Sequence, residues 1–130
     1  MKIEQRARRA VELKQSGSCN CCQAVAVALA DQTCLSEDAI RQAAAGFGAG
    51  IGNMEGTCGA LSGAVIVAGL KTGGAGSVRY TRQINESFKR MCGAVTCKTL
   101  KGLDGSGISC PCDLCVQNAV LAYGEVLGVE

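Results

Sequence analysis

Histidine is absent from this chain of 130 residues, and its absence narrows the chemistry open to the protein. Without an imidazole the chain cannot form a Ser-His-Asp or Cys-His hydrolase site, a His-ligated haem site, Rieske-type ligation or a mixed Cys/His zinc site. Tryptophan is also absent and aromatic residues make up only 3% of the chain. The core must therefore be built from Ala, Val, Leu, Ile and Cys, and such small side chains suit closely packed helices.

Strong net charge and long apolar runs are also missing. A net charge of +2 gives no argument for a nucleic-acid partner. The longest apolar run, about residues 60–70, is shorter than the roughly 20 residues that a membrane span needs. The first residues, MKIE, lead into a charged segment and not into an apolar signal segment. We therefore expect a cytoplasmic protein with no nucleic-acid partner and no membrane span.

Cysteine, in contrast, is abundant, with ten residues in the chain. In a reducing compartment such a content indicates metal binding or redox chemistry more than structural disulfides. Free cysteine is also a good small core residue, and we assign about half of the ten to that role. The length and the hydrophobic content of 48% predict one domain, residues 1–130, with its own core.

A glycine-rich loop followed by an apolar segment, residues 46–70, is the stretch around which the chain is organised. The loop has few side chains, so its backbone can approach a ligand or a neighbouring helix closely. Cys58 stands where the loop passes into a predicted helix over residues 57–71, and the free N–H groups at a helix start favour its thiolate form. One face of this helix is nearly bare, being made of Gly59, Ser62, Gly63, Ala64, Ala68 and Gly69. We expect close packing against this face, within the bundle and also in a homodimer.

Helical periodicity accounts for most of the chain, and no segment alternates at period two for long. The sequence therefore predicts an all-α fold, a compact bundle of about six helices around the helix of residues 57–71. The other helices are expected over residues 2–15, 18–31 and 37–46, from residue 77 onward, and from residue 111 to about 127.

The predicted helices also indicate which way individual side chains face. In the first, Arg6 is expected off the apolar stripe, and in the fifth Val78 is expected on it. In the second, Cys19 and Cys22 would share a face while Cys21 points elsewhere, so either Cys21 or the other pair faces a given site. Cys34 has no partner at a motif spacing, and we interpret it as structural.

Two further groups of cysteines lie near predicted helix starts. Cys97 follows a turn after Cys92, and the segment C-P-C-x-x-C places Cys110, Cys112 and Cys115 at the start of the last helix. A lone C-x-x-C without a βαβ pattern is a moderate redox signal, but it is stronger as half of a four-cysteine site. The glycine loop matches neither G-x-G-x-x-G nor a P-loop, which argues against a nucleotide.

Four segments together resemble a known family, the redox-active proteins named for the pattern C_GCAxxG_C_C. They are N-C-C-Q-A-V with Cys21, the glycine loop and helix with Cys58 in C-G-A-x-x-G, G-A-V-T-C with Cys97, and C-D-L-C-V with Cys112. The resemblance extends from about residue 18 to residue 127. The order C-G-A differs from the G-C-A of the family pattern, and six further cysteines are present.

The resemblance implies a helical fold, and a related domain in split-Soret cytochromes holds an iron–sulfur cluster through cysteines. By this resemblance Cys21, Cys58, Cys97 and Cys112 would converge on one cluster, most simply 2Fe–2S. Because of the extra cysteines, Cys22 is an alternate for Cys21, and Cys110 or Cys115 for Cys112. The physical setting agrees, since a cluster carries net negative charge and these sulfurs lie near predicted helix N-termini.

Other functions are compatible with the same residues. The leading interpretation is an iron–sulfur protein for electron transfer or redox sensing, which makes it a carrier more than a turnover enzyme. The alternatives are a structural or soft-metal site in which four cysteines hold zinc, and a thiol–disulfide redox protein using Cys58 with Cys97 or Cys112 as the resolving cysteine. A helical interaction domain with inert cysteines is the fourth. No electron partner is indicated by the sequence.

Overall fold

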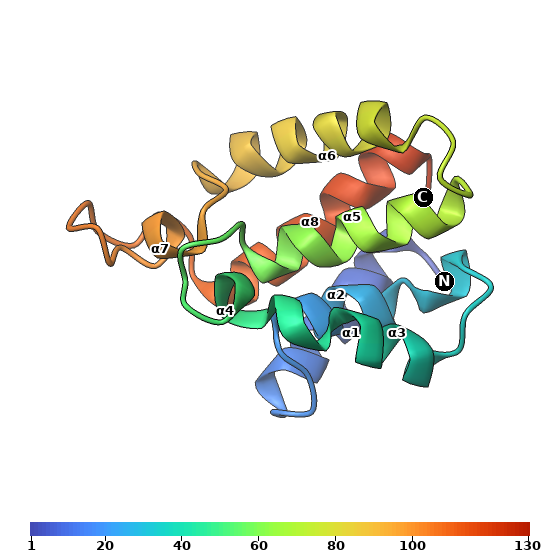
Figure 1. Ribbon diagram of the computed structural model, residues 1–130, viewed down its shortest axis with the longest axis horizontal. Coiled ribbons are helices and arrows are strands. Elements are labelled where there is room, and N and C mark those ends of the chain that lie inside the picture. Colours follow the sequence, from blue (N-terminus) through green and yellow to red (C-terminus); the bar gives the residue numbers. More distant parts are fainter.

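The computed structural model describes residues 1–130 as a bundle of helices without a sheet (Figure 1). In chain order the elements are α1 Ile3–Gln15, α2 Cys21–Ala28, the 3-10 turn η1 Ala30–Gln32, α3 Glu37–Ala44, the 3-10 turn η2 Ala45–Phe47, α4 Gly48–Ile51, α5 Gly59–Lys71, α6 Ser77–Cys92, α7 Cys97–Leu100 and α8 Cys112–Leu127. Six of the α-helices have eight residues or more, whereas α4 and α7 are single turns. The all-α fold predicted from the sequence is confirmed.

Helix α5 lies at the centre of the bundle, as predicted. It contacts α2, α6 and α8, and α1 packs on α2 and α8. In Figure 1, α5 runs between α6 on one side and the layer of α2 and α3 on the other. The buried hydrophobic residues form one cluster that reaches from Ile3 to Tyr123.

The first part of the bare face of α5, at Gly59 and Gly63, is occupied within the chain by α2 and η2. A Cβ atom on Gly63 would lie 2.6 Å from the carbonyl oxygen of Cys22, so only glycine allows this approach of the two backbones. A Cβ atom on Gly59 would lie 3.0 Å from the carbonyl oxygen of Phe47. This close packing is the reason that α5 can be central.

Helix α2 begins three residues later than predicted, at a capping box. The side chain of Asn20 accepts a hydrogen bond from the backbone N–H of Gln23 at 2.9 Å, and the Gln23 side chain accepts one from the N–H of Asn20 at 3.0 Å. Such reciprocal bonds satisfy two of the free donors at a helix start. Cys19 therefore precedes the helix, and the expectation that it shares a helix face with Cys22 is wrong.

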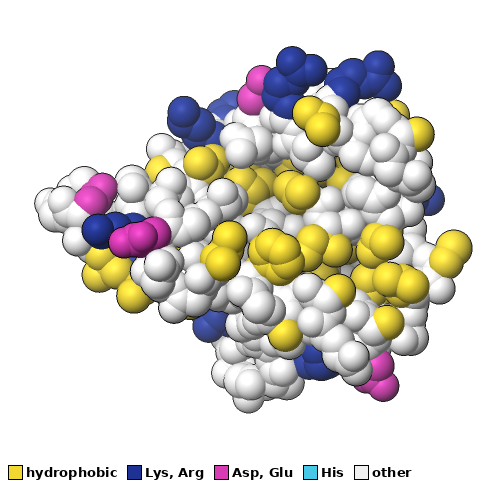
Figure 2. Space-filling view, in the orientation of Figure 1, with side chains coloured by type: hydrophobic (Ala, Val, Ile, Leu, Met, Phe, Trp, Pro, Cys, Tyr) yellow, Lys and Arg dark blue, Asp and Glu magenta, His cyan; other side chains and the backbone are white.

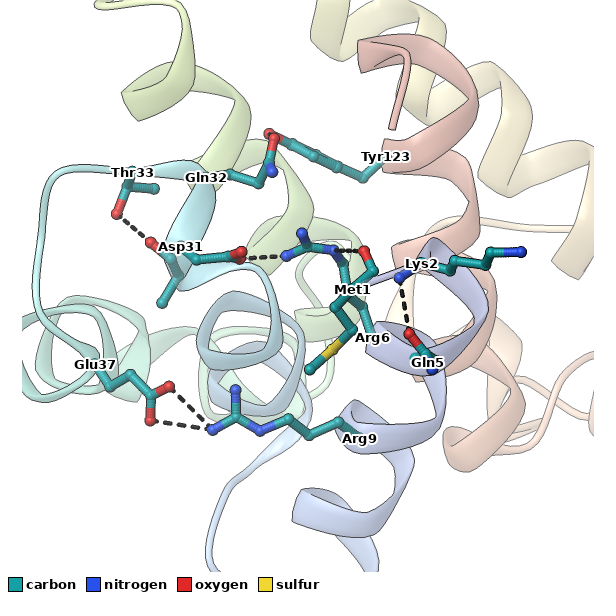
Figure 3. Close-up of polar contacts among 11 residues, drawn as sticks. Met1, Lys2, Gln5, Arg6, Arg9, Asp31, Gln32, Thr33, Glu37 and Tyr123 are labelled. Atoms are coloured by element: carbon teal, nitrogen blue, oxygen red, sulfur yellow. Dashed lines mark hydrogen bonds and ion pairs between the residues drawn. The ribbon is translucent and has the colours of Figure 1, made fainter. Parts of the chain in front are cut away.

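Two side chains differ from their predicted exposure. Arg6 is buried at 6% exposure, because its guanidinium forms an ion pair with Asp31 and its Nε donates to the carbonyl oxygen of Met1 at 3.1 Å (Figure 3). Arg9 on the same helix forms a second pair with Glu37 at 3.0 Å, so α1 is tied both to η1 and to the start of α3. Val78, expected to be buried, is 80% exposed.

An open groove of about 620 Å³ runs between α5 and α6. Its apolar lining includes Leu61, Val65 and Ile66 on α5 and Val78 on α6. Figure 2 shows hydrophobic side chains gathered in a band across this face, below the basic side chains of α6. None of the helices combines the length and the apolarity that crossing a membrane requires.

Candidate metal centre

A small cavity lies at the end of the bundle where α5 begins, and most of its lining is cysteine. Its residues are Cys21, Ala49, Cys58, Gly59, Cys97, Leu100, Lys101, Cys110, Cys112 and Cys115. In Figure 1 this is the end at which α4, α7 and the first turn of α5 lie together. All four cysteines singled out in the sequence line the cavity, and so do two of the three alternates. The third alternate, Cys22, is fully buried and does not line it.

The four predicted cysteines occupy equivalent positions in their helices. Cys21, Cys97 and Cys112 are the first residues of α2, α7 and α8, and Cys58 is the residue that precedes α5. The N–H groups of a first turn lack partners inside the helix and favour negative charge nearby. The chain thus directs four helix starts, from four distant segments, toward one group of sulfurs.

Backbone hydrogen bonds hold two of these segments together. The N–H of Cys58 donates to the carbonyl oxygen of Val95 at 2.7 Å, and the N–H of Cys97 donates to the carbonyl oxygen of Gly56 at 3.0 Å. Between them Thr57 and Thr96 form an isolated antiparallel bridge. The relative position of Cys58 and Cys97 is therefore set by the main chain.

The glycine loop closes one side of the cavity in a strained conformation. Ala49, Ile51 and Met54 are non-glycine residues with positive φ, of 53°, 58° and 65°. A non-glycine residue in this conformation lowers the stability of the fold by on the order of 1 kcal/mol, and backbone strain of this kind clusters at functional sites. The loop is held in place partly through the N–H of Lys98, which donates to the carbonyl oxygen of Met54 at 2.8 Å. Ala49 itself lines the cavity.

Cys21 and Cys112 form a thiol–thiolate pair in the cavity. A hydrogen bond from Cys21 lowers the pKa of Cys112 to about 6, against the effect of burial and with help from the positive charges of Lys101 and Lys14. The same hydrogen bond, together with burial, raises the pKa of Cys21. At neutral pH the pair therefore carries one negative charge on Cys112.

Cys58 is the second sulfur held as thiolate. A hydrogen bond from Cys115 lowers its pKa although burial opposes ionisation, and the backbone N–H groups of Ala60 and Leu61 also stabilise the anion. These two N–H groups belong to the first turn of α5, so the sequence prediction of a thiolate at this helix start agrees with the geometry. The hydrogen bond to Cys58 in turn raises the pKa of Cys115.

Lys101 supplies the positive charge at the cavity. Burial opposes its protonated form, but the neighbouring cysteine sulfurs, above all the thiolate of Cys112, raise its pKa overall. Lys101 was not among the residues predicted from the sequence. Lys101 lies four residues after Cys97, a separation that brings two side chains of one helical turn together, and this spacing is the signal that would have found it.

A second group of sulfurs, those of Cys92, Cys110 and Cys115, was also not predicted from the sequence. Their sulfur atoms all lie within 4.8 Å of one another, and all three residues are buried. In the sequence Cys92 stood out only by its spacing to Cys97, and nothing in that spacing indicates that α6 and α8 bring it to the other two. Of the remaining cysteines, Cys19 is buried with its sulfur accepting a hydrogen bond from Arg41 at 2.9 Å. Cys34 is exposed, so its interpretation as structural is wrong.

The family assignment follows from a match over most of the chain. A family model described as "Putative redox-active protein (C_GCAxxG_C_C)" matches residues 19–126. The chain belongs to this family. Searches of curated proteins and of solved structures found no match. The matched range contains every cysteine that lines the cavity and the whole Cys92, Cys110 and Cys115 group.

The donor set and the volume of the cavity restrict the metals that fit. All the donors are cysteine sulfurs, which suit zinc, Cu(I) and iron–sulfur clusters. The cavity measures about 20 Å³, enough for one particle the size of a water molecule. A single metal ion fits this space, whereas a two-iron cluster requires the sulfurs to move apart.

Proposed function

We propose that this protein is a redox carrier or sensor that binds an iron–sulfur cluster of the 2Fe–2S type through Cys21, Cys58, Cys97 and Cys112. The observation that carries the proposal is the convergence of these four sulfurs, one from each of four helix starts, on one cavity. A cluster of this type needs four protein ligands and is commonly held by four thiolates. When bound, it supplies one-electron oxidation and reduction.

The charges at the cavity support a negatively charged group. Cys58 and Cys112 are held as thiolates, which is the form that ligates metals, because hydrogen bonds lower the pKa of each. Lys101 and the first-turn N–H groups of α5 offset the negative charge that four thiolates bring together. Hydrogen bonds to the sulfurs are also a means by which a protein tunes a reduction potential.

The family description supports the redox part of the proposal, since the family is described as redox-active. Within that description, we propose a carrier and not a turnover enzyme. We propose a reducing, cytoplasmic setting and a redox partner protein for it. The single domain over residues 1–130 is part of the same proposal.

Zinc on the same four cysteines is the second candidate, favoured by the small volume. Zinc in structural sites is bound by four ligands in a tetrahedron with metal–sulfur bonds of about 2.3 Å. Such a site needs little more space than the cavity offers, whereas the cluster needs an outward movement of the sulfurs.

Anaerobic purification followed by iron, sulfide and zinc analysis tests these proposals. We expect a coloured protein with about two iron and two sulfide per chain, bound by the wild type and lost in Cys58→Ser. The control is Cys34→Ser, which removes an exposed sulfur that does not line the cavity. A colourless protein with one zinc would support the second candidate. A metal-free protein in which Cys58 pairs reversibly with Cys97 or Cys112 would instead support thiol–disulfide chemistry.

A further inference from the structure

A second group of sulfurs lies beside the four that we assign to the cluster. Cys92 is the last residue of α6, Cys110 precedes α8, and Cys115 is in the first turn of α8. Their three sulfur atoms lie within 4.8 Å of one another, and the residues are only 2–3% exposed. Three thiols from three segments of the chain thus meet in a site that water scarcely reaches.

The surrounding hydrogen bonds hold this group in position. The side-chain amide of Asn118, itself buried, donates to the sulfur of Cys92 at 3.4 Å. The hydroxyl of Ser109 donates to the carbonyl oxygen of Cys92 at 2.6 Å and so fixes the end of α6 against the segment that carries Cys110. The sulfur of Cys115 lies 3.4 Å from the carbonyl oxygen of Cys110, so these two residues are in contact. Metal ligands characteristically have such outer partners, which orient them.

The distances suit one metal ion. A metal–thiolate bond of about 2.3 Å in a planar three-ligand site places the sulfurs about 4 Å apart. The sulfurs here need to approach by less than about 1 Å to reach that arrangement, given their separation of at most 4.8 Å. We propose that Cys92, Cys110 and Cys115 form a second metal site, adjoining the four-cysteine site, that binds one Cu(I) ion.

The number of ligands favours Cu(I) over zinc. Soft thiolates select Cu(I) or zinc, but structural zinc is almost always bound by four ligands. A fourth sulfur in contact with the group is that of Cys58, which accepts a hydrogen bond from Cys115 and belongs to the other site. Three thiolates are sufficient for Cu(I). Each thiol that becomes a ligand releases its proton to solvent as the ion enters. Cys110 and Cys115 also line the cavity of the four-cysteine site, so the two sites adjoin.

Anaerobic titration of the reduced, metal-free full chain with Cu(I), in competition with a Cu(I) chelator, tests the site. The background is Cys21→Ser/Cys97→Ser/Cys112→Ser, which leaves Cys58 as the one sulfur of the four-cysteine site. We expect this background to retain one tightly bound ion, and the same background with Cys92→Ser to bind it at least about 10-fold more weakly. The background with Cys22→Ser is the matched control, since Cys22 is a buried cysteine outside the group, and it should bind the ion as tightly as the background does.

Equal Cu(I) affinity with Cys92→Ser and with Cys22→Ser in this background would overturn the proposal. So would a zinc titration in which the ion binds Cys92, Cys110 and Cys115 only when Cys58 is present, because the site would then be a four-sulfur zinc site. If a variant fails to fold by circular dichroism, wild-type crystals treated with Cu(I) decide the matter through anomalous scattering. A copper peak among the three sulfurs supports the site, and copper only among the other four sulfurs refutes it.

Discussion

The backbone N–H of Cys97 donates a hydrogen bond to the carbonyl oxygen of Gly56 at 3.0 Å, and this bond joins the segment before α5 to the start of α7. Together with the bond from Cys58 to Val95, it fixes two of the four sulfurs of the cavity through the main chain. The glycine loop packs directly on this connection. A Cβ atom on Gly50 would lie 2.6 Å from the Cβ of Cys97.

Gly50→Ala should therefore disturb the cavity. Gly50 has a φ of +57°, and an added methyl group would meet both Cys97 and the carbonyl oxygen of Gly56. We expect the free energy of unfolding to fall by about 2–4 kcal/mol, combining left-handed strain with overpacking. Urea denaturation of the metal-free protein measures this change, and metal content after anaerobic purification should fall in parallel.

Gly52→Ala is the matched control for this change. Gly52 also has a positive φ, of +84°, but a Cβ atom there meets nothing within 4 Å. The free energy of unfolding of Gly52→Ala should fall by only about 1 kcal/mol, and the variant should keep its metal. An equal fall in the free energy of unfolding of Gly50→Ala and Gly52→Ala would show that the contact with Cys97 does not add to the destabilisation.

The hydrogen bond from Cys21 should make Cys112 reactive in mildly acidic solution. With its pKa lowered to about 6, Cys112 is mostly thiolate at pH 7, and its alkylation should slow about 10-fold per pH unit only below pH 6. The measurement is the rate of iodoacetamide labelling at Cys112, followed by mass spectrometry on metal-free protein. A Cys34→Ser background removes the exposed competing thiol.

Cys21→Ala in that background removes the donor. The pKa of Cys112 should then rise, because its anion loses the hydrogen bond that is the main cause of the shift. Labelling at pH 7 should slow accordingly, while labelling well above pH 9 should be unchanged. A pH profile that is identical in both proteins would contradict the thiol–thiolate pair.

The sequence predicted the fold for physical reasons that are local, whereas the set of four cysteines came from the resemblance to the family. Helical periodicity and small side chains predicted six helices around α5, and the all-α bundle is confirmed. The position of Cys58 at a helix start was also readable, because glycine-rich loops end where side chains resume a helical pattern. These features depend on neighbouring residues alone.

What the sequence did not predict depends on contacts between distant segments. The burial of Arg6 requires Asp31 in η1, and no pattern within α1 indicates that partner. The group of Cys92, Cys110 and Cys115 requires α6 to end against the start of α8. The start of α2, in contrast, could have been predicted from neighbouring residues. Asn20 and Gln23 have the spacing of a capping box, but the helix was predicted to begin at residue 18.

The close contact of α2 and α5 gives a further prediction on stability. Gly63→Ala places a methyl group 2.6 Å from the carbonyl oxygen of Cys22, an atom of the backbone that cannot rotate away. We expect a loss of about 1–3 kcal/mol in the free energy of unfolding, measured by thermal or urea denaturation. In Gly69→Ala, on the same helix, the methyl group meets nothing within 4 Å. That variant should gain roughly 0.5–1 kcal/mol, since alanine is the better helix former.

Lys101 should influence the reduction potential of a cluster bound at the cavity. Its positive charge is attracted to the sulfurs of Cys112, Cys97 and Cys21, which raise its pKa, and the reduced cluster carries one more negative charge than the oxidised one. Lys101→Gln removes this attraction and so destabilises the reduced form more than the oxidised form. Because the side chain is partly exposed, solvent screens the effect to about 0.2–1 kcal/mol, or roughly 10–40 mV for one electron.

The potential of Lys101→Gln should therefore be lower than that of the wild type by this amount in a spectroscopic redox titration. Lys98→Gln is the control, since Lys98 is on the same short helix but is exposed and does not line the cavity. Raising the salt concentration should reduce the difference between Lys101→Gln and the wild type, because ions screen charges near the surface. An unchanged or higher potential in Lys101→Gln would mean that its charge does not act on the bound group, and the electrostatic argument for a negatively charged centre would lose its main support.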